Sequence, residues 1–135
     1  MAEALAVLAA EQRGWALEAQ SAGVEAMIGE PAAPNSVRAV REVGGDISGH
    51  IAQPVTDELV AWADRVVVME IRHATAVRER FPGADQKIQL LGHFGGVMEV
   101  GDPYGSWIFT YRRSRDLIHK CVEGLLDSMP PRPRS

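Results

Sequence analysis

The fold follows from the stretch Val66-Val67-Val68-Met69, an uninterrupted apolar run bounded by Asp64-Arg65 and by Glu70. A run of this kind is typical of a strand that is covered on both faces, as the strands of parallel sheets are. A second run, Lys87-Ile88-Gln89-Leu90-Leu91, follows after a segment of helical periodicity. The two runs with a helix between them predict neighbouring parallel strands.

Helical periodicity lies on both sides of these strands. We expect helices over residues 2–12, 37–43, 74–81 and 106–126, a short helical turn over residues 56–62, and a further strand over residues 17–21. Asn35 or Ser36 is available to cap the second helix, and Thr56 opens the short turn. The alternation predicts an α/β fold, a three-layer sandwich with a short parallel sheet and helices on both faces. Such folds normally begin on a strand, so we expect the first strand of the sheet to be absent from this chain.

Length and composition predict one domain. The 135 residues, 46% of them hydrophobic and 24% charged, fit a single core, which we place at residues 1–129. Residues 130–135, Pro-Pro-Arg-Pro-Arg-Ser, have little to bury and are predicted to form a disordered tail.

The net charge and the cysteine content of the chain narrow the classes of binding partner and the cellular compartment. A formal net charge of −4 disfavours nucleic-acid and anionic-membrane binding, because neither polyanion is attracted to such a surface. The single cysteine cannot form an internal disulfide, no signal peptide opens the chain, and no apolar run approaches the roughly 18 residues of a membrane span. We therefore expect a cytoplasmic protein. His73, His93 and His119 lack metal-ligand spacing, so neither a metal nor another cofactor is predicted.

The stretch Gly101-Asp102-Pro103-Tyr104-Gly105 is the candidate site loop. It lies between a strand-like run and the last helix and has no periodicity of its own. Binding and catalytic groups concentrate in loops that a rigid scaffold positions. Asp-Pro and Tyr-Gly are also ordinary turn formers, so composition alone leaves both readings open.

A family resemblance rests on several segments that occur in one order. They are Met1-Ala2-Glu3-Ala4-Leu5, Ser21-Ala22-Gly23-Val24, Gly45-Asp46-Ile47-Ser48-Gly49-His50, residues 63–70, residues 87–92, and Asp102-Pro103-Tyr104-Gly105 with the helix that contains Tyr111. Together they resemble the low-molecular-weight protein tyrosine phosphatases, including the bacterial protein-arginine phosphatase branch. Each motif is weak by itself, and their shared order carries the resemblance.

The resemblance implies a mechanism and roles for residues. In the family, a cysteine thiolate attacks the phosphoryl group, backbone amides and an arginine hold its oxygens, and an aspartic acid protonates the leaving group before activating water. Asp102 would be this general acid and base, Tyr104 and Met27 would lie beside the substrate pocket, and Ser21 and His50 would form a polar shell that braces the phosphate loop. The implied substrate is a phosphorylated protein or a small aryl phosphate. Tyr104 favours an aryl or planar leaving group through stacking, and phosphotyrosine and phosphoarginine both stay open.

The sequence departs from the family at the nucleophile. The family's Cys-x-x-x-x-x-Arg motif, which directly precedes its first helix, has no counterpart in the 135 residues. Cys121 cannot replace it, because Asp127 and not arginine lies six residues later, and its spacing places it on the apolar stripe of the last helix.

Two explanations follow from this departure. In the first, the natural protein starts upstream of Met1 and is a phosphatase, whereas the 135 residues alone are inactive. In the second, the chain is an inactive phosphatase-like binding or regulatory protein, with self-association or a partner's strand completing the sheet.

Overall fold

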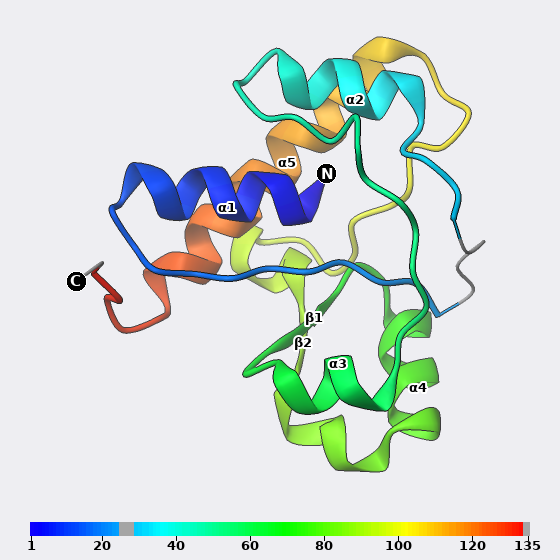
Figure 1. The fold of residues 1–135 in the computed structure, drawn as a ribbon, viewed down its shortest axis with the longest axis vertical. Coiled ribbons are helices and arrows are strands. Elements are labelled where there is room, and N and C mark those ends of the chain that lie inside the picture. The colour runs from blue at the N-terminus through cyan, green and yellow to red at the C-terminus, as the bar shows by residue number, and fades with distance from the viewer. Residues whose placement is uncertain (25–28, 134–135) are drawn as a thin grey trace.

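The computed structural model describes residues 1–24 and 29–133. Helices dominate, and the strands are short (Figure 1). In chain order, the elements are α1 (Ala2–Gln12), α2 (Pro34–Arg41), α3 (Asp57–Trp62), β1 (Val66–Val68), α4 (Ile71–Arg80), the 3₁₀ helix η1 (Pro82–Lys87), β2 (Ile88–Leu90), the 3₁₀ helix η2 (Leu91–Gly95) and α5 (Ile108–Asp127).

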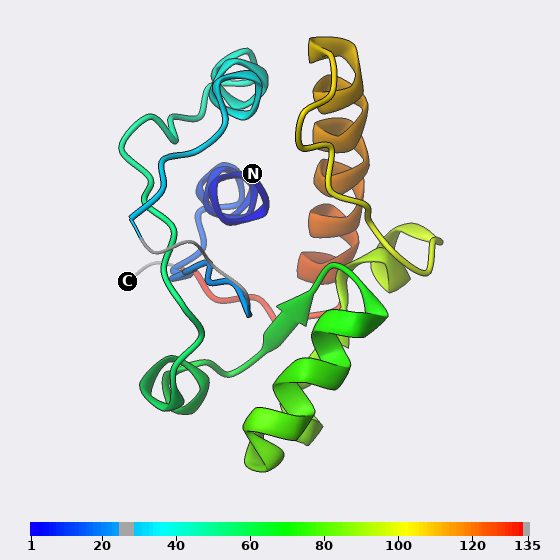
Figure 2. The ribbon, with the colours of Figure 1, turned by 90° about the vertical axis from the view of Figure 1, so that its right-hand side faces the viewer.

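The two strands form the predicted parallel sheet. Val66, Val67 and Val68 pair with Ile88, Gln89 and Leu90, and the crossover between them runs through α4 and η1. Both views place α1 and α5 on one side of the strands and α3 and α4 on the other (Figures 1 and 2). The α/β architecture with helices on both faces is therefore confirmed.

The main core lies between α1, α5 and the sheet. Leu5 and Ala9 of α1 meet Ile118 and Val122 of α5, and Val67 packs against this cluster from the sheet. In β1, only Val68 is fully buried, while Val66 and Val67 are half-buried. The expectation that the whole run is covered on both faces was too strong, because a sheet of two described strands gives β1 few neighbours.

The prediction of a strand over residues 17–21 is wrong. The structure assigns no strand there, and the isolated bridges of this segment lie at its ends, from Trp15 to Pro133 and from Gly23 to Pro54. Side chains satisfy the backbone of Ser21, because its N–H donates to Glu3 Oε1 and its carbonyl accepts from Gln53 Nε2. Alternating residues suit a strand, but a ladder also requires a neighbouring backbone.

The predicted capping was right for α3 and wrong for α2. Thr56 caps α3 by accepting a hydrogen bond from the Leu59 N–H at 3.2 Å. In contrast, α2 begins at Pro34 after Ala33 and has no side-chain cap. Proline suits the first position of a helix, because the N–H that it lacks would have had no partner there. Asn35 bonds elsewhere, as described below.

The end of the described chain lies against the segment that follows α1. The Arg132 carbonyl accepts a hydrogen bond from the Ala16 N–H at 2.7 Å, and the Arg132 guanidinium lies 3.7 Å from the Asp64 carboxylate. The division into a domain over residues 1–129 and a disordered tail stays a prediction. None of the helices in the described part of the chain is long and apolar enough to span a membrane.

Candidate functional site

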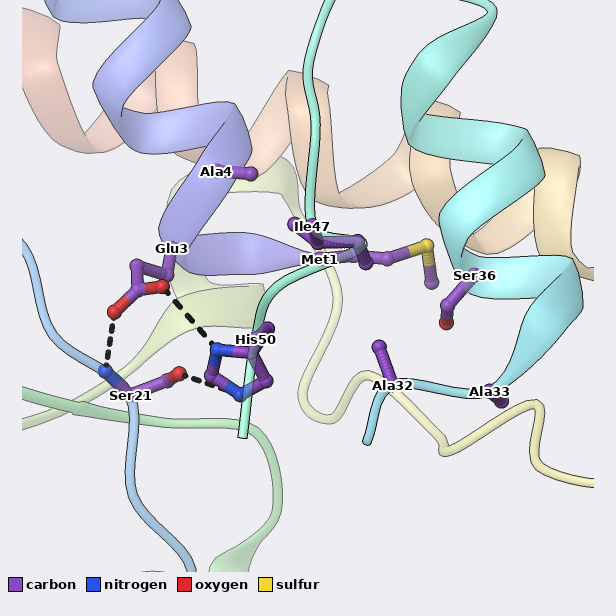
Figure 3. A pocket seen from close by; sticks show the side chains of 9 residues that line it. All are labelled: Met1, Glu3, Ala4, Ser21, Ala32, Ala33, Ser36, Ile47 and His50. Carbon is purple, nitrogen blue, oxygen red and sulfur yellow. Dashed lines mark hydrogen bonds and ion pairs between the residues drawn. The ribbon is translucent and has the colours of Figure 1, made fainter. Parts of the chain in front are cut away.

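A cavity of about 180 Å³ lies at the N-terminal end of α1 (Figure 3). Four segments form its wall: the first turn of α1, the extended chain after it, the start of α2, and the connection between α2 and α3. The lining residues are Met1, Glu3, Ala4, Ser21, Ala32, Ala33, Ser36, Ile47 and His50. The first N–H groups of a helix have no intrahelical partner, so the α1 terminus gives this cavity a partly positive end.

Three polar side chains meet on one side of the cavity. Glu3 accepts a hydrogen bond from the Ser21 N–H at 2.9 Å, and its other oxygen lies 3.6 Å from His50 Nδ1. The Ser21 hydroxyl lies 3.5 Å from His50 Nε2, at the outer limit of a hydrogen bond. Glu3 therefore fixes Ser21 through its backbone and faces one ring nitrogen of His50, while Ser21 faces the other (Figure 3).

Asp102 lies in the exposed loop that leads into α5. Its Oδ1 accepts a hydrogen bond from the Tyr104 N–H at 3.0 Å, which is the geometry of an Asx turn. The Tyr104 side chain is 80% exposed. Gly105 follows with φ +78°, a left-handed conformation that favours glycine. The loop thus holds the Asp102 carboxylate at the surface by its own local geometry.

The Asp102 loop lies on the same side of the molecule as the start of α1. Burial lowers the pKa of the Met1 α-amino group, and the carboxylates of Glu3 and Asp102 act in the opposite direction. The Asp102 carboxylate therefore lies close enough to the Met1 nitrogen for the two charges to interact. Asp102 and Tyr104 do not themselves line that cavity.

The structure thus brings together two of the five site residues expected from sequence, Ser21 and His50, and adds Glu3 to them. Met27 lies outside the described residues. Sequence reasoning missed Glu3 because an acid in the first turn of a helix has an ordinary explanation in the helix dipole. Its position within the family-like segment Met1–Leu5 was the signal that could have identified it.

The chemistry of the cavity suits an anion. It offers a helix terminus, the Ser21 and Ser36 hydroxyls, and the His50 imidazole, while the Glu3 carboxylate on its wall is engaged by the Ser21 N–H and faces His50. Cys121 lies elsewhere, fully buried in α5, where burial raises the pKa of its thiol and disfavours the nucleophilic thiolate. Across residues 1–24 and 29–133, no cluster of three or more His, Cys, Asp or Glu side chains could hold a metal ion.

Comparison with known proteins gives the chain its family. The sequence model of the family described as low molecular weight phosphotyrosine protein phosphatase matches residues 1–132. A protein-arginine-phosphatase of Bacillus subtilis is 32% identical over 127 residues, which are 93% of this chain and 84% of that protein. The low molecular weight protein-tyrosine-phosphatase Wzb of Escherichia coli is 32% identical over 106 residues, 78% of this chain and 72% of that protein.

Among solved structures, the low molecular weight protein tyrosine phosphatase from T. tengcongensis superposes with a TM-score of 0.90 at 30% identity, covering 95% of this chain and 88% of that one. The likeness in sequence extends over nearly the whole chain, and the likeness in fold includes the sheet and the helices on both of its faces. The chain belongs to the low molecular weight phosphotyrosine protein phosphatase family.

Proposed function

We propose that this protein hydrolyses phosphotyrosine or phosphoarginine in phosphorylated proteins through a cysteinyl-phosphate intermediate, with Asp102 as general acid and base. The observation that carries the proposal is the position of Asp102, an exposed carboxylate that an Asx turn holds in the loop leading into α5. A general acid must approach the leaving group from the side opposite the nucleophile, so a separate loop is the natural place for it.

The proposed reaction has two steps. A thiolate attacks phosphorus, the bond from phosphorus to the leaving oxygen or nitrogen breaks, and Asp102 gives its proton to that atom. Water then attacks phosphorus, the sulfur–phosphorus bond breaks, and the Asp102 carboxylate takes the proton of the water. Asp102 thus ends each cycle protonated, as it began.

The remaining residues support this chemistry. Ser21 and His50, held by Glu3, are proposed to position the phosphate-binding backbone at the start of α1. Tyr104, exposed beside Asp102, is proposed to stack on a planar leaving group. Met27, outside the described residues, stays a candidate for the substrate pocket. Positioning of this kind matters because small displacements of reacting groups lower rates strongly.

The nucleophile is proposed to come from residues N-terminal to Met1. Cys121 is the only cysteine of the 135 residues and is buried away from the cavity. Loss of the nucleophile typically costs about six orders of magnitude in rate, so the 135-residue chain alone is expected to be inactive. The second candidate is an inactive binding or regulatory protein. Residues 17–21 have no ladder partner within the described chain, and in this alternative a partner's strand or a second copy supplies one.

Two measurements test the proposal. The intact mass of the protein as its own cell makes it should exceed 14.7 kDa, and that product should hydrolyse phenyl phosphate. A product at 14.7 kDa without activity would favour the binding protein.

In the active product, Asp102→Asn should slow phosphoryl transfer from phenyl phosphate by about 10²- to 10⁴-fold, the usual contribution of a general acid. The effect should be smaller with p-nitrophenyl phosphate, whose leaving group is more acidic and needs less protonation. Asp64→Asn, at an exposed acid in the connection from α3 to β1, is the matched control. An unchanged rate in Asp102→Asn would remove Asp102 from the mechanism.

A further inference from the structure

A second, open cavity of about 370 Å³ lies between the first turn of α2 and the start of α5. It is lined by Asn35, Arg38, Gly105, Ser106, Trp107 and Ile108, and we call it the Arg38–Trp107 groove. Asn35 Nδ2 donates to the Ser106 carbonyl at 3.2 Å and joins the two walls. The groove is therefore a feature of tertiary packing and not of one flexible loop.

The two residues that name the groove are unusual for a protein surface. Trp107 is 76% exposed, which leaves a large apolar ring in water. Arg38 is exposed and makes no side-chain hydrogen bond or ion pair within the described part of the chain, whereas Arg112 and Arg115 on the neighbouring α5 both bind Glu42. Tryptophan and arginine are enriched among the residues that dominate binding at protein interfaces.

The groove adjoins the proposed active site on two sides. The loop that carries Asp102 continues through Gly105 into the groove wall. The first turn of α2 separates the two cavities, because Ser36 lines the cavity at α1 while Asn35 and Arg38 line the groove. A polypeptide that presents a phosphorylated side chain to Asp102 would carry its neighbouring residues past the groove.

The charge of the groove wall indicates which residues next to the phosphorylated side chain it can bind. The only charged side chains of α2 are Arg38 and Arg41. Glu42, the next acid along the chain, is held by Arg112 and Arg115. Although the whole protein is acidic, with a net charge of −4, this wall of the groove is locally basic.

We infer that the Arg38–Trp107 groove binds the substrate polypeptide next to its phosphorylated residue and selects aspartate or glutamate there. This inference rests on the proposed phosphatase function and specifies its substrate class as acidic phosphoprotein segments. Arg38 pairs with the acidic side chain, and Trp107 packs against the peptide backbone and its apolar atoms. The acidic residue of the peptide supplies the negatively charged partner that Arg38 lacks within the described chain.

Binding can be measured on the 135-residue chain without catalysis. The probe is a short phosphotyrosine peptide with aspartate and glutamate around the phosphotyrosine, and its counterpart has lysine at those positions. The chain contains three tryptophans, Trp15, Trp62 and Trp107, whose indole N–H signals can be assigned by substitution in nitrogen-15 NMR spectra. The acidic peptide should shift the Trp107 signal in a saturable manner, and the lysine peptide should not.

Variants distinguish binding in the groove from general electrostatic attraction between the peptide and the protein. Arg38→Ala should weaken binding of the acidic peptide by about threefold, the range of an exposed ion pair. Trp107→Ala should weaken it by about tenfold or more, as for a binding hot spot. Arg41→Ala removes the same charge one turn later on α2, outside the groove, and Trp62→Ala removes an exposed ring elsewhere. Equal losses in Arg38→Ala and Arg41→Ala, or a Trp107 signal that does not move, would overturn the inference.

Kinetic measurements on the protein as its own cell makes it distinguish this inference from the proposed function. Phenyl phosphate has no flanking polypeptide, so its hydrolysis tests the function alone. If it is hydrolysed, kcat/KM should be higher for the acidic than for the lysine peptide, and Arg38→Ala should reduce that ratio. Hydrolysis without such a preference would overturn the groove assignment only. No hydrolysis of phenyl phosphate would overturn the proposed function, and a negative indole titration would still refute the groove.

Discussion

The side-chain amide of Asn35 donates a hydrogen bond to the backbone carbonyl of Ser106, 3.2 Å away, and so joins segments 71 residues apart in the chain. Asn35 lies in the first turn of α2, and Ser106 lies between the Asp102 loop and α5. This bond is the contact through which α2 holds the end of the candidate site loop. The position of the loop therefore depends on tertiary structure as well as on its own turn.

Removal of this bond should destabilise the protein modestly. Asn35→Ala leaves the partly buried Ser106 carbonyl without its donor, so the free energy of unfolding should fall by about 1 kcal/mol in urea denaturation. Asn35→Asp is the matched variant, because it keeps the shape but replaces the donor with an acceptor. It should be at least as destabilising as alanine at pH 7, and a variant as stable as the wild type would show that the bond contributes nothing.

The same bond marks a limit of what the sequence could predict. The apolar run at Val66–Val68 and the periodicity of α4 and α5 are local signals, and the structure has these elements close to where they were expected. Asn35 has an equally strong local signal for capping, but a distant carbonyl binds its side chain instead. Local preference predicts what a residue can do, and the partner that tertiary packing brings to it decides what it does.

The residues of the candidate site also divide into those that the local sequence predicted and those that it did not. The Asp102 loop was visible as a non-periodic stretch with turn residues, and its Asx turn uses groups only two residues apart. The contact between Ser21 and His50 spans 29 residues and was expected only through the family resemblance. Glu3, which binds the Ser21 backbone, gave no local signal beyond that of a helix terminus, and only its place in the family-like segment Met1–Leu5 could have identified it.

Acid should weaken the connection between α2 and α5. Hydrogen bonding from Arg112, aided by Arg115, lowers the pKa of Glu42 from its ordinary value of 4.5 to about 2. Because the folded-state pKa is the lower one, this stabilisation is complete above about pH 4.5 and is lost as the pH falls toward about 2. Glu42→Gln should therefore be less stable than the wild type at pH 7, and thermal melts should show that the difference shrinks between these two pH values.

The control for Glu42 is another exposed glutamate. Glu11 lies in α1, and its side chain has no hydrogen bond or ion pair with the rest of the described chain. Glu11→Gln should therefore not alter how stability changes with pH below pH 4.5. If the two variants respond to acid alike, the pairing of Glu42 with Arg112 does not stabilise the fold.

Close approach of η2 to α5 predicts an unusual glycine effect. A Cβ at Gly124 would collide with the backbone carbonyl of Phe94, which a side-chain rotation cannot relieve. Glycine to alanine in the interior of a helix normally stabilises it by about 1 kcal/mol. Here, Gly124→Ala should instead reduce the free energy of unfolding by about 1–3 kcal/mol, as overpacking does.

Gly101 provides the comparison for Gly124. A Cβ at Gly101 would have no atom within 4 Å, and its φ lies outside the left-handed range. Gly101→Ala should therefore change the free energy of unfolding by no more than ordinary surface substitutions do, about 0.5 kcal/mol. A stabilising Gly124→Ala would mean that η2 and α5 are farther apart than the structure has them.

The reactivity of Cys121 tests whether the thiol of this chain could act as a nucleophile. Its side chain is 0% exposed, and burial raises its pKa, so the native protein should hold an unreactive thiol. Modification by an aromatic disulfide reagent should be more than about a hundredfold slower than in urea, because it requires opening of the core. The control is Ser48→Cys combined with Cys121→Ala, which places the thiol at an exposed position and should react rapidly. Rapid reaction of native Cys121 would contradict its burial and return it to consideration as the nucleophile.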